Sequence, residues 1–258
     1  MRYGAKRAGC GAMALVLFGC GLGAATEAFA ACSSQSVGTP VNGTLRGGRE
    51  MPRASAHHVV QPFTVRHELR WATCRLVDGL LAVAREVTRD RRLPLVIGNL
   101  SQKGGGEMKH SASHESGRDV DIAFQVADER GRARFPVYHR FDSKLESRSH
   151  GPRYRFDVAR NWQIVAALLR APHFEIERIV IAPYLRAALL DHAQTHGEDA
   201  AMMALARTKV VPPWPGVKLH DNHFHVRIAC DPSTEPRCRE VPLTRAIASN
   251  ARGAGGAG

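Results

Sequence analysis

The chain has 258 residues, and its 36 Lys and Arg against 24 Asp and Glu give a formal net charge of +12 at pH 7. This length allows one well-buried domain but excludes two of comfortable size. The basic charge favours nucleic acid, an anionic membrane or an acidic polymer as the partner, with a solvated arginine-rich surface as the alternative.

Residues 1–30 are predicted to be a signal peptide. Arg2, Lys6 and Arg7 form a basic start, and an apolar run then leads to the small-residue cleavage site Ala28-Phe29-Ala30. We therefore expect a periplasmic protein with no stable membrane insertion after cleavage. Losing three basic residues and Glu27 leaves a formal charge of +10. Export argues against nucleic acid as the partner and favours a cell wall that carries free carboxylates.

A second processing site competes with this one. Leu17-Phe18-Gly19-Cys20 resembles a lipobox, so lipid anchoring at Cys20 is a minor alternative, against which the bulky Phe18 counts. A retained membrane helix is a weaker alternative, because the apolar run is short and broken by glycines.

Four cysteines remain after removal of the signal, an even number that suits an oxidising compartment. Cys230 and Cys238 bracket a proline-containing loop, which predicts a local disulfide, and a bond between Cys32 and Cys74 follows by elimination. Metal binding by these thiols is the alternative, but no CxxC spacing supports it.

Composition divides the rest of the chain into three parts. Residues 31–60 are polar and rich in Gly and Pro, and are expected to be an extended N-terminal arm. Residues 61–248 form the main domain, and residues 249–258 are expected to be a disordered tail.

The main domain is predicted to mix helices and short strands. Apolar residues at spacings of three and four, including Trp71 on the inner face, predict an amphipathic helix from Leu69 to Val87, and Asp157 is the expected N-cap of a second helix. The other expected elements are strands at 93–97, 119–124, 176–182 and 224–229 and a helix at 184–196. This pattern indicates a single α+β domain with a small, mainly antiparallel sheet flanked by helices.

The segment SHESGRDVDI, residues 113–122, carries side chains that can ligate a metal. It offers His114 on a loop and Asp121 on a strand. Because side chains alternate across a strand, the apolar neighbours of Asp121 would be buried, and Asp119 would share the face of Asp121.

The segment HDNHFHVRI, residues 220–228, offers two more ligand-type groups. His223 and His225 flank Phe224, so both imidazoles point one way while Phe224 points toward a core. Three protein ligands and an open fourth position are typical of a catalytic zinc, whereas structural zinc has a closed shell. We expect Zn²⁺ in a cleft on the sheet, with another divalent metal as the alternative.

Both segments resemble those of the penicillin-insensitive murein endopeptidases, within a wider group of zinc peptidases that includes lysostaphin, D-Ala-D-Ala carboxypeptidases and the hedgehog-like domain. The resemblance is close in the two segments and looser from Thr39 to Cys238, through GNLSQKGGG before the first segment and RNW at 160–162. It implies that residues 61–248 are a zinc metallopeptidase domain.

The resemblance also implies the role of each site residue. His114, Asp121 and His225 would bind zinc, His223 would stand beside the attacking water, and His220 matches a further active-site histidine. Relatives commonly carry another histidine three residues before the first ligand. This chain has Ser111 there and His110 one position upstream. His110 is therefore a candidate for that role. The alternative is that no residue of this chain has it.

By the same resemblance, the expected function is zinc-dependent D,D-endopeptidase activity on peptidoglycan, cutting the bond between D-Ala and meso-diaminopimelate in a penicillin-insensitive way. One alternative is a D,D- or L,D-carboxypeptidase on the same fold, and another is a zinc-bearing wall-binding protein without activity. Arg118 and Arg227 are expected either to meet substrate carboxylates or to hold the two motif strands by salt bridges, and Asp119 to hydrogen-bond a ligand histidine. The oligomeric state is not predicted.

Overall fold

The computed structural model describes residues 32–89, 93–109, 111–147 and 152–241. The predicted signal peptide, His110 and the predicted tail lie outside these ranges. Among the described residues there are five helices: α1 (Pro62–Arg66), α2 (Cys74–Thr88), α3 (Val158–Arg170), α4 (Pro183–Thr195) and α5 (Ala200–Lys209). None of these helices has both the length and the apolar composition to cross a membrane.

Short strands alternate with these helices, which confirms the α+β class. The strands are β1 (Gln35–Thr39), β2 (Asn42–Arg46), β3 (Arg49–Glu50), β4 (His58–Val60), β5 (Trp71–Ala72), β6 (Leu95–Ile97), β7 (Asp119–Ala123), β8 (Val126–Asp128), β9 (Ala133–Arg134), β10 (Tyr154–Phe156), β11 (Ile176–Val180), β12 (Val210–Val211) and β13 (His223–Ile228).

The largest sheet has six strands in the order β12-β11-β13-β7-β6-β4. Its centre is antiparallel, because β13 pairs with β11 and β7, and β7 pairs with β6. β12 and β4 join the two edges in parallel. The sheet is therefore mixed, and the two motif strands, β7 and β13, lie side by side in its middle.

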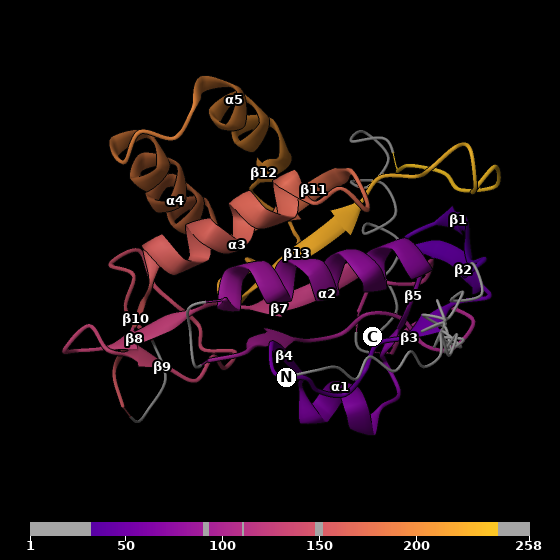
Figure 1. The fold of residues 1–258 in the computed structure, drawn as a ribbon, viewed down its shortest axis with the longest axis horizontal. Coiled ribbons are helices and arrows are strands. Elements are labelled where there is room, and N and C mark those ends of the chain that lie inside the picture. Colours follow the sequence, from indigo (N-terminus) through magenta and orange to yellow (C-terminus); the bar gives the residue numbers. More distant parts are fainter. Residues whose placement is uncertain (1–31, 90–92, 110, 148–151, 242–258) are drawn as a thin grey trace, which may run out of the picture. The chain divides into compact units, whose positions relative to one another are not determined.

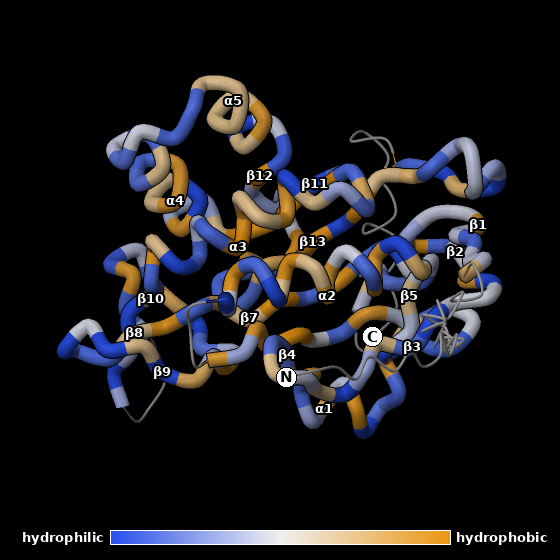
Figure 2. The backbone as a smooth tube through the Cα atoms, viewed as in Figure 1, coloured by the Kyte–Doolittle hydropathy of each residue, from blue (hydrophilic) through white to orange (hydrophobic). Residues whose placement is uncertain are grey.

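Helices α2 and α3 run across one side of the central strands (Figure 1). α2 contacts β6, and α3 contacts β11 as well as α2, α4 and α5. Hydrophobic residues concentrate along these helices and the strands beneath them (Figure 2). Asp157 caps α3 as predicted, since its side chain accepts a hydrogen bond from the Arg160 backbone N at 3.1 Å.

The first long helix begins later than its apolar spacing predicted. Leu69 and Ala72 precede α2, and Trp71 lies in β5, half-buried, so its placement on a helical face was wrong. The reason is competing backbone pairing: Trp71 and Ser101 exchange two N–H···O hydrogen bonds of 2.9 Å, and β5 pairs with β3. The extended arm was expected at residues 31–60, and β1 to β4 lie within that range.

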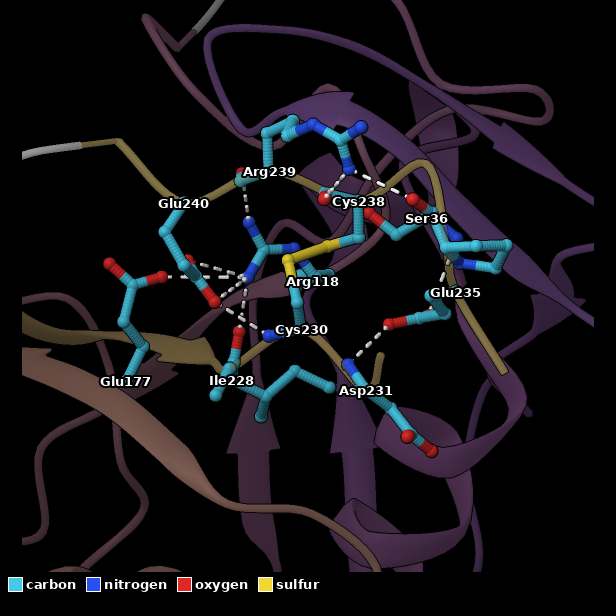
Figure 3. The surroundings of a disulfide bond; sticks show 12 residues. Ser36, Arg118, Glu177, Ile228, Cys230, Asp231, Glu235, Cys238, Arg239 and Glu240 are labelled. Atoms are coloured by element: carbon cyan, nitrogen blue, oxygen red, sulfur yellow. Dashed lines mark hydrogen bonds and ion pairs between the residues drawn. A yellow bond between two sulfur atoms is a disulfide. The ribbon is translucent and has the colours of Figure 1, made fainter. Parts of the chain in front are cut away.

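Both predicted disulfides are present, Cys32–Cys74 and Cys230–Cys238. The second lies beside Arg118, which is fully buried (Figure 3). The Arg118 guanidinium forms an ion pair with Glu240 at 3.1 Å and donates to the backbone oxygens of Ile228 at 2.7 Å and Arg239 at 3.1 Å. The segment after β13 is thus tied to the residue that precedes β7.

Candidate metal centre

The register of β7 and β13 brings the two motifs together. His225 is opposite Asp121, and Arg227 is opposite Asp119. Strand alternation sends Phe224 into the core, where it is fully buried and its ring centroid lies 4.8 Å from that of Phe124. Side chains about a hundred residues apart in the sequence therefore meet on one face of the sheet, as the sequence predicted.

One oxygen of Asp121 is the centre of the cluster. Its Oδ1 lies 3.1 Å from His225 Nδ1, 3.3 Å from His114 Nε2 and 3.5 Å from His223 Nε2. His114, Asp121 and His225 are buried, and each offers one ligand atom within 4.8 Å of the others, so these three residues could hold a metal ion. Two imidazole nitrogens and one carboxylate oxygen fit the ligand preference of zinc.

Asp119 fixes the orientation of His225. Asp119 Oδ1 lies 3.1 Å from His225 Nε2 and accepts a hydrogen bond from Arg227 Nε at 2.7 Å. If His225 donates its Nε2–H to this carboxylate, the lone pair of Nδ1 faces the cluster. Asp119 therefore has the role expected of it, and Arg227 is bound to Asp119 instead of projecting toward a substrate.

The two carboxylates also raise the proton affinity of His225. Burial lowers its pKa, but the hydrogen bonds to Asp119 and Asp121 outweigh burial and raise the pKa to about 9. Burial would raise the pKa of Asp121, but its interactions with His114, His223 and His225 hold this pKa well below its ordinary value. The cluster thus attracts a positive charge, which a proton or a metal ion can supply.

His220 and His223 lie beside the three candidate ligands. Their ring centroids are 5.3 Å apart, and that of His220 is 5.6 Å from His225. His220 Nδ1 lies 2.6 Å from the Lys218 backbone oxygen, and His223 Nδ1 lies 2.7 Å from Asn222 Oδ1. Because oxygens accept, each Nδ1 carries the hydrogen, and each Nε2 keeps a lone pair.

Both of these histidines are neutral near pH 7. Burial, with the positive charge of His225, lowers the pKa of His220 to about 3. Burial also lowers the pKa of His223 below its ordinary value, although the Asp121 charge acts in the opposite direction. Each is therefore able to accept a proton on Nε2.

His114 and His220 share an uncommon backbone conformation. Their φ angles are 75° and 54°, in the left-handed region that favours glycine. A histidine kept in this region costs conformational energy, and such residues cluster at functional sites. Here the conformation turns a loop histidine toward the sheet at either end of the cluster.

Sequence reasoning missed Tyr138, which lies on the loop between β9 and β10. Its ring centroid is 5.3 Å from that of His223, and burial, together with the Asp121 charge, raises its pKa well above the ordinary value. No periodicity or motif marks this loop, so no sequence pattern pointed to Tyr138. Gly98 carried a signal only as the first residue of GNLSQKGGG.

The fold and the cluster define a class, an α+β domain with a His/Asp/His group that could hold a metal at the centre of its sheet. The chain belongs to the penicillin-insensitive murein endopeptidase family, whose model matches residues 36–249. It is similar to the penicillin-insensitive murein endopeptidases of Escherichia coli O1:K1 / APEC and of strain SMS-3-5 / SECEC. Each is 26% identical over 213 residues, covering 82% of this chain and 72% of the relative.

Proposed function

We propose that this protein is a zinc-dependent D,D-endopeptidase that hydrolyses peptidoglycan cross-links between D-Ala and meso-diaminopimelate and is insensitive to penicillin. Family membership and the names of its relatives support murein as the substrate. The strong positive charge of the chain, +12, suits a polymer that carries free carboxylates. Removal of residues 1–30 as a signal peptide would place the enzyme in the periplasm, where this substrate lies.

The observation that carries the proposal is the buried group His114, Asp121 and His225, with two neutral histidines beside it. A wall-binding protein would need the first three residues at most. It would have no need of two further imidazoles with free Nε2 lone pairs, one of them held at a strained backbone position. The arrangement therefore favours hydrolysis.

When bound, zinc would polarise a peptide carbonyl and lower the pKa of a water molecule. The remaining chemistry belongs to side chains. We assign His223 as the base that takes a proton from the attacking water, because its Nε2 lies 3.5 Å from Asp121 Oδ1. The same nitrogen would then give the proton to the leaving amine. His220 would assist by accepting a hydrogen bond from the attacking water through the lone pair of its Nε2.

Asp119 and Arg227 would hold the ligand His225 in one tautomer throughout. Asp119 is fully buried and bound to both partners. An Asp119→Asn change would keep the shape of this side chain and lose its charge. Arg118 takes no part in the reaction, because Glu240 and two backbone oxygens occupy its guanidinium.

The test is incubation of the purified protein with cross-linked peptidoglycan dimers, with and without a chelator, and analysis of the products by mass. Conversion of dimers to intact monomers that the chelator abolishes and added Zn²⁺ restores is the expected result. Penicillin should leave the rate unchanged. Release of free D-Ala alone would replace the proposal with a carboxypeptidase, and bound zinc without any conversion would favour a wall-binding protein.

A further inference from the structure

The hydroxyl of Tyr138 is buried in the interior without a hydrogen-bond partner among the described residues. Buried hydroxyls in native proteins nearly always have a partner, so each exception needs a reason. A phenylalanine would fill the same space and leave no polar atom unsatisfied. The tyrosine hydroxyl therefore points to a use that the contacts within the chain do not reveal.

Gly98 makes room for this hydroxyl beside Asp121. A Cβ at position 98 would lie 1.8 Å from the Tyr138 hydroxyl oxygen and 3.1 Å from Asp121 Cβ. No side chain can share this space, because 1.8 Å is far inside van der Waals contact. The glycine thus lets a phenol from a distant loop reach the candidate ligand.

The backbone of Asp121 is fixed at the same place. Gly98 N donates a hydrogen bond to the Asp121 backbone oxygen at 2.7 Å, and Asp121 N donates to the Asn99 oxygen at 2.9 Å. The backbone of Asp121 is therefore held, and its side-chain carboxylate is the part that can still rotate. The closest contact of each of its three histidine neighbours is to Oδ1.

A carboxylate that binds a metal through one oxygen is commonly held by a hydrogen bond to the other, and loss of such a bond typically costs 10 to 100-fold in metal affinity. A phenol has an ordinary pKa of about 10, so Tyr138 keeps its proton near neutral pH and can donate it. Its ring, packed beside His223, limits the directions in which the hydroxyl can point.

We propose that Tyr138 is a positioning residue whose hydroxyl donates a hydrogen bond to Asp121 when this carboxylate binds the metal. The inference rests on the metal site of the proposed function but not on the reaction. Gly98 is also required, because any larger residue at position 98 would displace the Tyr138 phenol.

The experiment measures Zn²⁺ affinity by competition with a chromophoric chelator for the wild-type protein and for Tyr138→Phe. The expected result is a Kd raised about tenfold in the variant. The visible spectrum of the Co²⁺-loaded protein should change as well, because the field at Asp121 is altered. The melting temperature of the metal-free protein should stay the same or rise, since a buried unpartnered hydroxyl has been removed.

Tyr154→Phe is the matched control. Tyr154 is half-buried on β10, with its ring centroid 4.6 Å from His139, and it does not touch the cluster. This variant should bind Zn²⁺ like the wild type. Equal affinity in wild type and Tyr138→Phe would overturn the proposal, as would an effect of the same size in Tyr154→Phe.

Gly98→Ala tests whether the Tyr138 hydroxyl needs the space left by the missing side chain at position 98. It should weaken Zn²⁺ binding about as much as Tyr138→Phe, and the double variant should lose little more, because both changes remove one interaction. If the alanine variant does not fold, Tyr138→Phe alone decides. A wild type that binds Zn²⁺ tighter than Tyr138→Phe but leaves peptidoglycan intact would uphold this inference and refute the proposed function. A wild type that binds no Zn²⁺ would overturn both.

Discussion

Two buried polar clusters lie along β7, and they are of opposite kinds. Around Arg118 a cation meets the carboxylate of Glu240 and the backbone oxygens of Ile228 and Arg239. Around Asp121 a carboxylate oxygen faces the imidazole nitrogens of His114 and His225. The first cluster is balanced by its own chain, and the second requires a proton or a metal ion. Residues of one ten-residue motif thus divide between holding the fold and binding a ligand.

The sharpest test of this division lies within the second cluster. His225→Ala should abolish both zinc retention and hydrolysis, because it removes a ligand. His223→Ala should keep the metal and lower kcat by about 10²- to 10⁴-fold, the usual contribution of a general base. Metal content after dialysis and the rate on peptidoglycan dimers measure both effects. Equal zinc loss in the two variants would overturn the assigned roles.

A substitution in the first cluster should change the stability of the fold and leave metal binding unaltered. Arg118→Ala removes a fully buried cation and leaves the Ile228 backbone oxygen and the largely buried Glu177 carboxylate, 3.5 Å from Arg118, without it. This change should lower the free energy of unfolding by about 3–5 kcal/mol. Denaturant unfolding of the metal-free protein measures this loss. Arg170→Ala is the control, since Arg170 forms an exposed ion pair with Glu86 that should contribute less than about 1 kcal/mol. A large fall in zinc affinity in Arg118→Ala would contradict the division.

The disulfide beside Arg118 should have a smaller effect. Cys230 and Cys238 are separated by eight positions, and closing so short a loop contributes roughly 2–3 kcal/mol in the chain-entropy model. A double change of both residues to Ser should lower stability by this amount under oxidising conditions, with zinc affinity unaltered. Calorimetry or denaturant unfolding gives the difference. An unaltered midpoint would show that the disulfide adds nothing to the stability of the segment.

The last expected effect is a pH dependence of stability at the edge of the first cluster. Burial, with the nearby Glu240, raises the pKa of Glu177 to about 7, although Arg227 and Arg178 act in the opposite direction and Arg118 lies 3.5 Å away. The folded state therefore binds a proton more tightly than the unfolded state, and this contribution to stability is lost as pH rises from about 4.5 to 7.

Glu177→Gln should remove that slope, so the variant gains stability relative to wild type above pH 7. Unfolding free energies measured at several pH values between 4 and 8 test the sign. Parallel curves for the two proteins would contradict it. Glu86→Gln, at an exposed ion pair, is the matched control and should follow the wild type.

The sequence predicted the local arrangement well because strand alternation is a short-range property. His223 and His225 share a face, Phe224 is buried, and Asp157 caps a helix, and each of these follows from neighbouring residues alone. The family resemblance joined the two motifs, and the structure shows the register that does so, His225 opposite Asp121.

Long-range pairing explains what the sequence could not predict. Leu69 and Ala72 continue the apolar spacing of α2, yet backbone hydrogen bonds to Ser101 place Trp71 in a strand. The Tyr138 hydroxyl occupies the space beside Asp121 that a side chain at residue 98 would fill, a relation between two loops that no local pattern records. Interactions between segments distant in the sequence therefore determine both the strand at Trp71 and the position of Tyr138.

The Cys32–Cys74 bond makes the stability of the fold depend on whether the chain is in a reducing or an oxidising compartment. It closes a loop of 42 positions that contains β1 to β5 and α1, and joins the start of the described chain to the first residue of α2. Closing a loop of this size contributes about 4 kcal/mol in the chain-entropy model. A reducing cytoplasm would withhold this contribution, and an oxidising periplasm would supply it. With the export proposed above, the chain would therefore be harder to unfold after export than before.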